Sequence, residues 1–293
     1  MKAAIMGFGT VGSGVYEVLD RNRETVRKKA GEPIEIKYIL NRRDLPGSPV
    51  EDLVVHEIGT ILEDPETGLV VETMGGTSPA YEYVKCCLQA GKHVVTSNKN
   101  LVAAHGTELL AIAREKRVSF LFEASVAGGI PVLTSITGAL QSNNFIEIMG
   151  ILNGTTNYIL TKMTEESLSY EEVLKDAQDK GFAEADPTAD VEGIDAANKL
   201  SILMALSFDK YVAPEDIPTK GISKITDRDI SSAASQNKVI KLIGTARMED
   251  GKLQYCVQPT LLDNTHPLAG VGNEFNAVYI TGDMVGELMF YGK

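Results

Sequence analysis

The sequence predicts an α/β protein with two domains. Over about the first 125 residues, short apolar runs alternate with helical patterns, which is typical of βαβ units and a parallel sheet. A glycine-rich turn, Gly7-Phe-Gly-Thr-Val-Gly12, follows the first apolar run directly and opens a helical pattern. In the last third of the chain, apolar runs flank Asp250-Gly251 and Gly282-Asp283, as in β-hairpins. We therefore expect a second, α+β domain whose sheet is mainly antiparallel.

The first domain is expected to alternate strands and helices in the order that builds a parallel sheet. Residues 54–64 are ambiguous, with a short strand followed by a helix as one reading. The candidate strands are residues 2–6, 34–40, 68–72, 93–96 and 118–122, and the candidate helices are residues 11–29, 79–90 and 101–116.

The character of the sequence changes at about residue 133, where the second domain is expected to begin. A strand is predicted at residues 145–152, followed by helices. The helical patterns cover residues 155–164, 170–180 and 191–206, and the two hairpins pair residues 239–247 with 253–262 and residues 277–281 with 285–291. The predicted domains are thus residues 1–132 and 133–293, without an internal repeat.

Composition excludes several classes of function. A formal net charge of −12 disfavours binding to a nucleic-acid backbone or to an anionic membrane surface. No window of 18 apolar residues and no leader-like N-terminus is present, so we expect a cytoplasmic protein. Cys86, Cys87 and Cys256 lack metal-ligand spacing, and reduced thiols are the simplest account. The four histidines are scattered without a motif, which disfavours a His/carboxylate metal site.

The glycine-rich turn indicates a site for a dinucleotide. Glycines at this place allow a tight turn and close approach to a pyrophosphate, and the N-terminus of the following helix attracts the anion. Because Gly7, Gly9 and Gly12 follow an N-terminal strand within a βαβ pattern, we interpret the segment as the start of a Rossmann domain. The alternative is a plain strand–helix turn.

The end of the second predicted strand favours NADP over NAD. An NAD site usually has an acid there to hold the ribose 2′-hydroxyl, whereas an arginine suits a 2′-phosphate. In this sequence Asn41 occupies the position and is followed by Arg42 and Arg43. A solvated turn remains the alternative interpretation of these arginines.

An acid-rich stretch at residues 182–200 is the most informative segment of the second domain. Asp195 and Lys199 lie one helical turn apart and would share a face of a helix. Glu184 and Asp186 precede that helix, and carboxylates beside a positioned amine suit proton transfer to an oxygen. The alternative is an ordinary surface helix, with Asp190 as its N-cap and a salt bridge worth ~0.3–0.5 kcal/mol.

Together with these features, several further motifs closely resemble homoserine dehydrogenase, in order along almost the whole chain. The family reduces aspartate 4-semialdehyde to homoserine with NAD(P)H on the route to threonine and methionine. It pairs a Rossmann domain with a domain that carries the substrate site and a dimer interface, so a homodimer is expected. The motifs are Glu72-Thr-Met-Gly-Gly-Thr77, Val95-Thr-Ser-Asn-Lys99, Glu123-Ala-Ser-Val-Ala-Gly-Gly-Ile-Pro131, Gly150-Ile-Leu-Asn-Gly-Thr-Thr-Asn-Tyr158, Gly181-Phe-Ala-Glu-Ala-Asp-Pro187 and Asp195-Ala-Ala-Asn-Lys199.

The resemblance implies roles for individual residues. Lys199 and Lys99 would be the two lysines at the reacting centre, with Asp195 orienting Lys199. Glu184 would receive the substrate ammonium, and Asp190 would be a further pocket acid. The resemblance also implies that Gly154 and Thr155 contact the amino-acid portion, that the cofactor residues are Gly7, Gly9, Thr10, Val11, Gly12, Asn41, Arg42, Arg43, Gly75, Thr77 and Lys99, and that the carbonyls of Glu123, Val126, Gly128 and Ile130 bind a monovalent cation, sodium being expected.

Two other functions fit these residues less well. An aspartate-semialdehyde dehydrogenase requires an activated cysteine nucleophile, but Cys86 and Cys87 lie in a helical pattern without a suitable histidine nearby. A non-catalytic NAD(P)-binding regulator would keep the glycine turn but would need neither lysine. The presence of Lys99, Asp195 and Lys199 together disfavours the regulator.

The end of the sequence carries one further expectation. In the resembling family, the strand that matches residues 287–291 leads into a glycine-rich turn and a helix that returns to the Rossmann domain. The sequence stops at Gly292-Lys293. A chain that truly ends there is expected to lack this closing helix, with low thermal stability and weakened cofactor binding. Without a kinase or a regulatory domain in the sequence, a monofunctional enzyme is expected.

Overall fold

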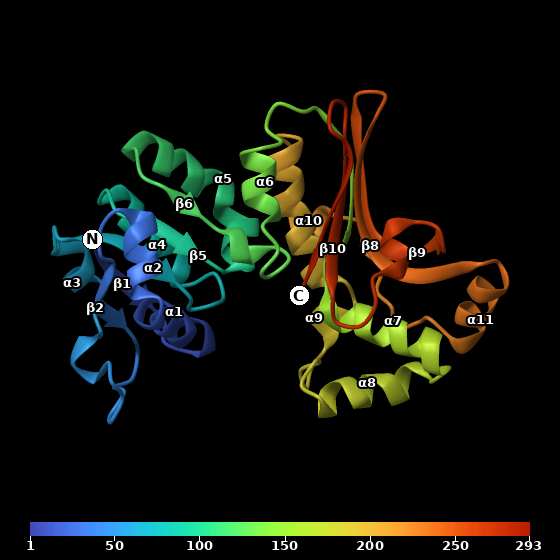
Figure 1. The fold of residues 1–293 in the computed structure, drawn as a ribbon, viewed down its shortest axis with the longest axis horizontal. Coiled ribbons are helices and arrows are strands. Elements are labelled where there is room, and N and C mark those ends of the chain that lie inside the picture. Colours follow the sequence, from blue (N-terminus) through green and yellow to red (C-terminus); the bar gives the residue numbers. More distant parts are fainter. The chain divides into compact units, whose positions relative to one another are not determined.

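A computed structural model describes residues 1–293, and the chain divides into two compact units (Figure 1). The N-terminal unit comprises Met1–Ser125 and the C-terminal unit comprises Val126–Lys293. The predicted boundary after residue 132 lies a little further along the chain and stays a prediction. No helix in either unit is long and apolar enough to cross a membrane.

The N-terminal unit contains a parallel sheet, as predicted, and this sheet has six strands because the ambiguous residues 54–64 begin with a short strand. Its strand order is β3-β2-β1-β4-β5-β6, so the order reverses between β1 and β4. In open α/β sheets, a ligand crevice forms at the carboxyl ends of the strands where the order reverses. The strands are β1 (Lys2–Met6), β2 (Glu35–Leu40), β3 (Val54–Val55), β4 (Thr67–Glu72), β5 (His93–Thr96) and β6 (Phe120–Leu121).

The helices of this unit differ from the prediction at one point. The helix expected over residues 11–29 is two helices, α1 (Thr10–Arg21) and α2 (Arg23–Ala30), with a break at Asn22. Residues beyond the break are mostly charged and none of α2 is buried, so no packing holds the two helices in line. The other helices are α3 (Ile58–Glu63), α4 (Ala80–Gln89) and α5 (Lys99–Lys116).

The C-terminal unit contains a five-stranded antiparallel sheet in the order β11-β10-β7-β8-β9. Both predicted hairpins are confirmed: β8 pairs with β9 around Asp250 and Gly251, and β10 pairs with β11. The strands are β7 (Phe145–Ile151), β8 (Lys238–Glu249), β9 (Lys252–Asp263), β10 (Asn276–Gly282) and β11 (Gly286–Gly292).

Helices α7, α10 and α11 pack against β8 of this sheet. The helix expected over residues 191–206 is interrupted by Gly193, whose φ of +81° separates α9 from α10. Asp190 therefore lies inside α9, and its interpretation as the N-cap of the long helix is wrong. Two helices, α6 and α11, were not predicted. The helices are α6 (Val132–Thr137), α7 (Gly154–Glu166), α8 (Tyr170–Asp179), α9 (Thr188–Val191), α10 (Ile194–Ser207) and α11 (Asp227–Ser235).

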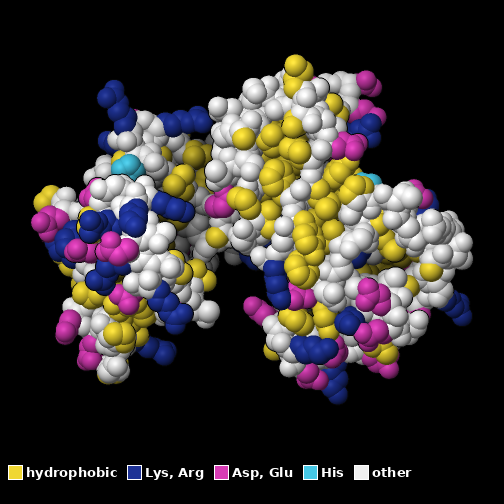
Figure 2. Space-filling model, viewed as in Figure 1, with side chains coloured by type: hydrophobic (Ala, Val, Ile, Leu, Met, Phe, Trp, Pro, Cys, Tyr) yellow, Lys and Arg dark blue, Asp and Glu magenta, His cyan; other side chains and the backbone are white.

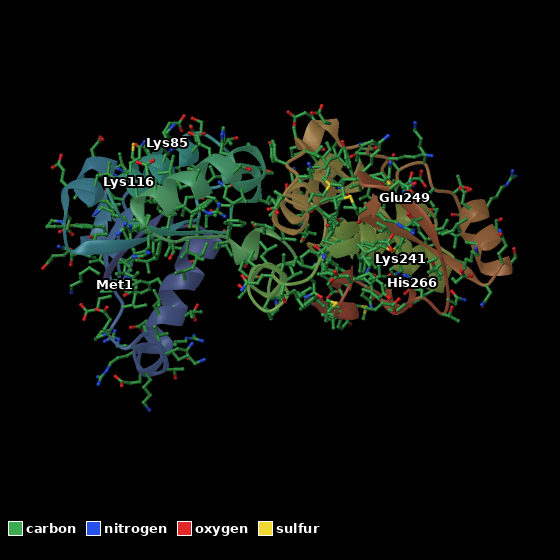
Figure 3. The ribbon with its side chains drawn as sticks, turned by 90° about the horizontal axis from the view of Figure 1, so that it is seen from above. Met1, Lys85, Lys116, Lys241, Glu249 and His266 are labelled. Carbon is green, nitrogen blue, oxygen red and sulfur yellow. The ribbon has the colours of Figure 1, made fainter.

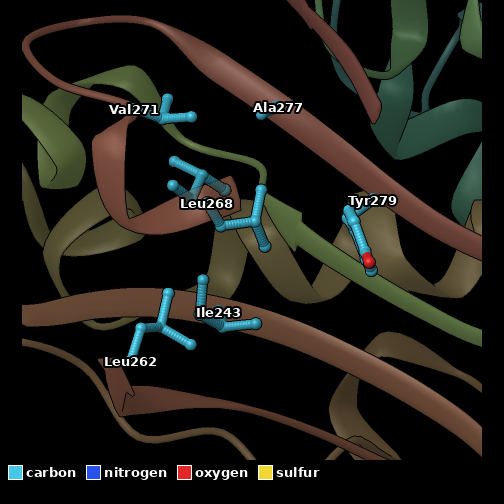
Figure 4. Close-up of a cluster of buried hydrophobic side chains, with 7 residues drawn as sticks. Ile243, Leu262, Leu268, Val271, Ala277 and Tyr279 are labelled. Carbon is cyan, nitrogen blue, oxygen red and sulfur yellow. The ribbon is translucent and has the colours of Figure 1, made fainter. Parts of the chain in front are cut away.

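A cluster of buried apolar side chains covers one end of the antiparallel sheet (Figure 4). Leu268 and Val271, from the short helix η4 (Pro267–Gly270) and the residue after it, pack on sheet residues that include Ile243. Burying a side chain of this size contributes about 1.5–3 kcal/mol relative to leaving it exposed. This packing fixes the segment after η4 against the sheet.

Candidate active site

The glycine turn of the N-terminal unit has the geometry of an anion-binding turn. Gly7 has a φ of +90°, and Gly9 is the N-cap of α1 without a side-chain cap, which leaves backbone N–H groups at the helix start for a ligand. A Cβ on Gly12 would overlap the carbonyl oxygen of Gly7, so only glycine fits there. Thr73, after β4, donates from its hydroxyl to the carbonyls of Met6 (3.2 Å) and Gly7 (2.8 Å) and thereby fixes the turn.

A pocket of about 540 Å³ opens beside this turn. It lies where Gly7 follows β1, Asn41 follows β2 and Thr73 follows β4, at the point where the strand order reverses. Six of the predicted cofactor residues line it: Gly7, Gly9, Asn41, Arg42, Arg43 and Gly75. Residues that the sequence analysis did not single out also line it, namely Phe8, Leu40, His56, Thr73, Met74, Ser78, Pro79 and Tyr83. Thr10, Val11, Gly12, Thr77 and Lys99 are not part of its lining.

His56 adds a titratable group to the arginine end of the pocket. Its Nδ1 donates to the carbonyl of Asn41 (2.8 Å), and its Nε2 lies 3.0 Å from Oδ1 of Asp44. The Asn41 carbonyl and the Asp44 carboxylate both favour the doubly protonated ring and raise the pKa of His56 above its ordinary value. Two guanidinium groups and an imidazole with a raised pKa therefore border the same pocket.

Lys99 begins helix α5 in the same unit. Asn98 caps this helix, accepting from the N–H of Leu101 (3.2 Å) and donating from its amide to the carbonyl of Gly76 (2.6 Å). The fully buried carboxylate of Glu72 accepts from Thr96 Oγ1 (2.5 Å) and from the N–H of Met74 (2.7 Å). These bonds join the ends of β4 and β5, so the start of α5 and Lys99 have a fixed position in the unit.

In the C-terminal unit, Lys199 and Asp195 form the predicted pair on α10. Lys199 Nζ donates to Asp195 Oδ2 (2.8 Å) and to the carbonyl of Leu152 (2.7 Å). The side chain of Asp195 is only 3% exposed and that of Lys199 is 15% exposed. A buried ion pair with additional hydrogen bonds differs from a solvated surface salt bridge, because each partner would be costly to leave alone. The alternative of an ordinary surface pair is therefore wrong.

Asn153, which the sequence analysis did not name as a site residue, joins the two acids. Its amide donates to Asp190 Oδ1 (2.7 Å) and to Asp195 Oδ2 (2.9 Å), and its own oxygen accepts from the N–H of Thr156 (2.9 Å) as the N-cap of α7. An asparagine directly after a strand and before a helix signals a cap, but sequence alone does not show which acids its amide reaches.

Thr155 and Gly154 lie at the same place on the first turn of α7. Thr155 Oγ1 lies 2.7 Å from the carbonyl of Phe182, to which it donates, and 3.2 Å from Asp190 Oδ2. A Cβ on Gly154 would lie 2.7 Å from the carbonyl oxygen of Glu274, so the close approach admits only glycine. Glu184 is exposed in the loop before α9, where its carbonyl accepts from the side chain of Gln178 (3.1 Å).

The structure thus brings together four predicted residues of the C-terminal unit, Thr155, Asp190, Asp195 and Lys199, around Asn153. Glu184 lies outside this hydrogen-bond network. For the predicted cation site, Glu123 belongs to the N-terminal unit and Val126, Gly128 and Ile130 to the C-terminal unit. The carbonyl of Ile130 already accepts from the N–H of Val132 (2.8 Å).

Two family models match the chain, one for each part. The model for the NAD-binding domain of homoserine dehydrogenase matches residues 7–123, and the model for homoserine dehydrogenase matches residues 131–293. The second match alone covers more than half of the chain.

Characterised relatives and solved structures agree with these matches. The homoserine dehydrogenase of Bacillus subtilis is 47% identical over all of this chain and 68% of its own length. A crystal structure of a homoserine dehydrogenase from Thiobacillus denitrificans superposes with a TM-score of 0.93 at 40% identity, over all of this chain and 68% of its own. A hyperthermophilic archaeal homoserine dehydrogenase in complex with NADPH superposes with a TM-score of 0.84 at 26% identity, over 99% of this chain and 91% of its own.

Proposed function

Because the chain belongs to the homoserine dehydrogenase family, we propose that Lys199 is the proton donor to the substrate oxygen and that the pocket of the N-terminal unit holds NADP. The chain is an oxidoreductase that reduces aspartate 4-semialdehyde to homoserine with a nicotinamide cofactor, a step of amino-acid biosynthesis.

The proposed role of Lys199 is supported by the number of N–H donors that its ammonium uses within the protein. An ammonium has three N–H donors, and two of them are used by the Leu152 carbonyl and Asp195. The third N–H remains for a substrate oxygen. When bound, the nicotinamide supplies hydride to the aldehyde carbon, and negative charge then develops on the aldehyde oxygen. Lys199 stabilises this charge and transfers its proton, while the buried carboxylate of Asp195 holds the amine in place.

Lys99 is proposed as the second lysine of the reaction. Its support is the resemblance to the family motif and its fixed place at the start of α5, directly after the capping residue Asn98. A second ammonium would share the stabilisation of the developing charge on the substrate oxygen.

The rest of the C-terminal network is proposed to bind the amino-acid portion of the substrate. Gly154 and Thr155 present the first turn of α7, where backbone N–H groups attract a carboxylate. Glu184 and Asp190 are the proposed carboxylates for the substrate ammonium. The support for Glu184 is its exposed place in the loop before α9, where a carboxylate is available to a ligand.

The direct test is NADPH consumption with aspartate 4-semialdehyde, followed by absorbance. The wild-type protein should catalyse the reaction. Lys199→Met and Lys99→Met should each lower kcat by roughly 10²–10⁴-fold, which is the usual contribution of a positioned acid–base group. Lys162→Met is the matched control, because Lys162 forms a helical i,i+4 pair with Glu166 away from the network. Near-normal kcat in the folded Lys199→Met and Lys99→Met variants would contradict the assignment of both lysines.

NADP is proposed as the preferred cofactor, with NAD as an alternative. The pocket fits the phosphorylated form because Arg42, Arg43 and His56 all border it, and none of its lining side chains is a carboxylate. Arginine pairs with phosphate through charge-assisted and often bidentate hydrogen bonds.

A homodimer is proposed through the sheet of the C-terminal unit. Met149, Thr245, Cys256, Tyr279 and Met289 are successive partners across the strands and therefore share one face. Apolar side chains gather over this sheet in Figure 2, and Met289 is 43% exposed although it is large and apolar. Light scattering coupled to size exclusion should give the mass of two chains, and Met289→Glu should shift the protein toward one.

The monovalent cation at the carbonyls of Glu123, Val126, Gly128 and Ile130 is also a proposal. Ala127, a residue with a Cβ, has a φ of +60°, and backbone strain at such a residue often marks a functional segment. Melting curves at increasing sodium chloride, with choline chloride added to keep the ionic strength constant, test it, because a site-bound sodium ion raises the melting temperature as its concentration passes the dissociation constant.

A further inference from the structure

Lys241 is a buried charged residue to which the reaction assigns no role. It lies on β8 inside the C-terminal unit (Figure 3) and is only 4% exposed. Its Nζ donates to the carbonyl of Val271 (2.7 Å) and to Asn157 Oδ1 (3.0 Å), and lies 3.4 Å from Thr161 Oγ1. Burial lowers the pKa of Lys241 to about 8. A buried amine is costly to keep, so its hydrogen bonds show what it holds together.

The partners of Lys241 connect helix α7 to the segment of residues 271–275, called here the 271–275 loop. The amide of Asn157 on α7 donates to the carbonyls of Val271 (3.1 Å) and Phe275 (3.0 Å). Thr161, one turn further along α7, accepts from the N–H of Asn273 (3.1 Å). Lys241 reaches from the sheet to both sides of this junction and fixes the loop against the helix.

The 271–275 loop in turn covers the first turn of α7. The carbonyl of Glu274 lies so close to Gly154 that a Cβ there would be 2.7 Å from it. Gly154 is the first residue of α7, next to Asn153, whose amide holds Asp190 and Asp195. A movement of the loop would therefore move the helix turn that carries Gly154 and Thr155.

We propose that Lys241 is a positioning residue for the amino-acid substrate, which acts by holding the 271–275 loop against α7 and so fixing the position of Gly154 and Thr155. The inference rests on the proposed role of these two residues in substrate binding. Lys241 makes no contact with the network of Lys199 and Asp195, so its effect is expected on substrate binding rather than on proton transfer.

A second buried lysine provides the matched control. Lys92 in the N-terminal unit is 5% exposed and donates to the carbonyls of Asp64 (2.8 Å) and Thr67 (2.8 Å). Lys241→Met and Lys92→Met both remove a buried ammonium and its hydrogen bonds to backbone carbonyls. Both should lower the melting temperature, but only Lys241→Met removes a hydrogen bond to the 271–275 loop.

The experiment measures KM for aspartate 4-semialdehyde, KM for NADPH and kcat in both variants. Lys241→Met should raise KM for aspartate 4-semialdehyde about tenfold, with a smaller change in kcat and an unchanged KM for NADPH, because a small displacement of a substrate-positioning group has a large effect. Lys92→Met should leave both KM values unchanged. If both variants melt earlier and neither changes KM for aspartate 4-semialdehyde, Lys241 is only a structural residue and the inference is overturned.

A milder variant guards against loss of folding. Thr161→Val keeps the volume of the side chain but removes the acceptor for Lys241 and for Asn273, and it should raise the same KM about threefold. An unchanged KM in folded Thr161→Val overturns the inference. Gly154→Ala separates the two proposals, because its Cβ displaces the backbone of the first turn of α7: if it raises KM for aspartate 4-semialdehyde while Lys241→Met does not, only this inference fails. If Gly154→Ala has no effect, the proposed substrate role of the first turn of α7 fails, and the inference falls with it.

Discussion

The site residues of the two units differ in how deeply they are buried and in how they are hydrogen-bonded. In the N-terminal unit, the pocket is lined by a backbone turn and by loop side chains such as Arg42 and Arg43, which are exposed and free to adjust. In the C-terminal unit, Asp195 and Asn153 are almost fully buried and hydrogen-bonded to one another. A buried charge tolerates no loss of a partner, whereas exposed charges contribute separately. We therefore expect substitutions in the C-terminal network to act on the whole network and those in the N-terminal pocket to act independently.

The first prediction, with the largest effect, tests the buried network of the C-terminal unit. Asp195→Ala leaves the amine of Lys199 and the amide of Asn153 without their shared acceptor. Turnover should fall by roughly 10²–10⁴ and the free energy of unfolding by about 3–5 kcal/mol, as for other broken buried pairs. Steady-state kinetics and chemical denaturation of the same sample measure the two losses. Loss of activity without loss of stability would show that the network is not a single unit.

The second prediction tests the exposed arginines of the N-terminal pocket. The double variant Arg42→Ala, Arg43→Ala should lower kcat/KM for NADPH by about 10- to 100-fold, the value of one or two charge-assisted hydrogen bonds, and leave kcat/KM for NADH nearly unchanged. Its melting temperature should match that of the wild type, because neither arginine is buried. A clear advantage for NADH in the wild type, unaltered in the variant, would mean that these arginines only solvate the turn.

Asn153 has two roles that can be tested separately: its oxygen caps α7, and its amide contacts the two acids of the C-terminal network. Asn153→Asp keeps an oxygen to cap α7 but replaces the amide by a third carboxylate beside Asp190 and Asp195. We expect kcat to fall about tenfold or more while the helix stays capped. Asn153→Ala should lose activity and, in addition, about 1 kcal/mol of stability from the lost cap. Wild-type kcat in Asn153→Asp would remove the amide from the mechanism.

The smallest expected effect is a pH dependence of cofactor choice. The pKa of His56 is raised by the Asn41 carbonyl and the Asp44 carboxylate, so its imidazolium persists above the ordinary pKa of about 6.5. Its attraction for a 2′-phosphate is therefore present at low pH and is lost as pH rises through the raised pKa. The ratio of kcat/KM for NADPH to that for NADH should fall a few-fold across this range. In His56→Gln the ratio should be flat, and a wild-type pH profile in that variant would exclude His56.

Sequence reasoning reached the fold because periodicity and turn residues report local structure directly. Both hairpins and the parallel sheet follow from apolar runs and glycine-containing turns. It missed the interruption at Gly193, because an isolated glycine in an apolar helical pattern is compatible with a continuous helix until its φ is known. It also joined α1 and α2, since charged residues such as those after Asn22 have good helix propensity even where nothing packs on them.

The site was predictable where a pair lies within one element and less so where it is formed by distant segments. Asp195 and Lys199 are four residues apart on one helix, and their contact follows from that spacing. His56 approaches the arginines because β3 pairs with β2, and Asn153 reaches Asp190 across 37 residues. No local sequence pattern predicts contacts between segments so far apart in the chain. The burial of Lys241 also could not be predicted from the sequence, since a lysine in a strand normally points to solvent.

The overlap that forbids a side chain at position 12 has a consequence for protein engineering. The first glycine turn accepts no variation at this point, because any Cβ would displace the Gly7 carbonyl that Thr73 holds. Attempts to change cofactor preference must therefore leave this turn intact. The segment after β2 and the loop that carries His56 face the same pocket and are free of that packing constraint. Libraries confined to these two surface segments could exchange one dinucleotide for another without reopening the core of the sheet.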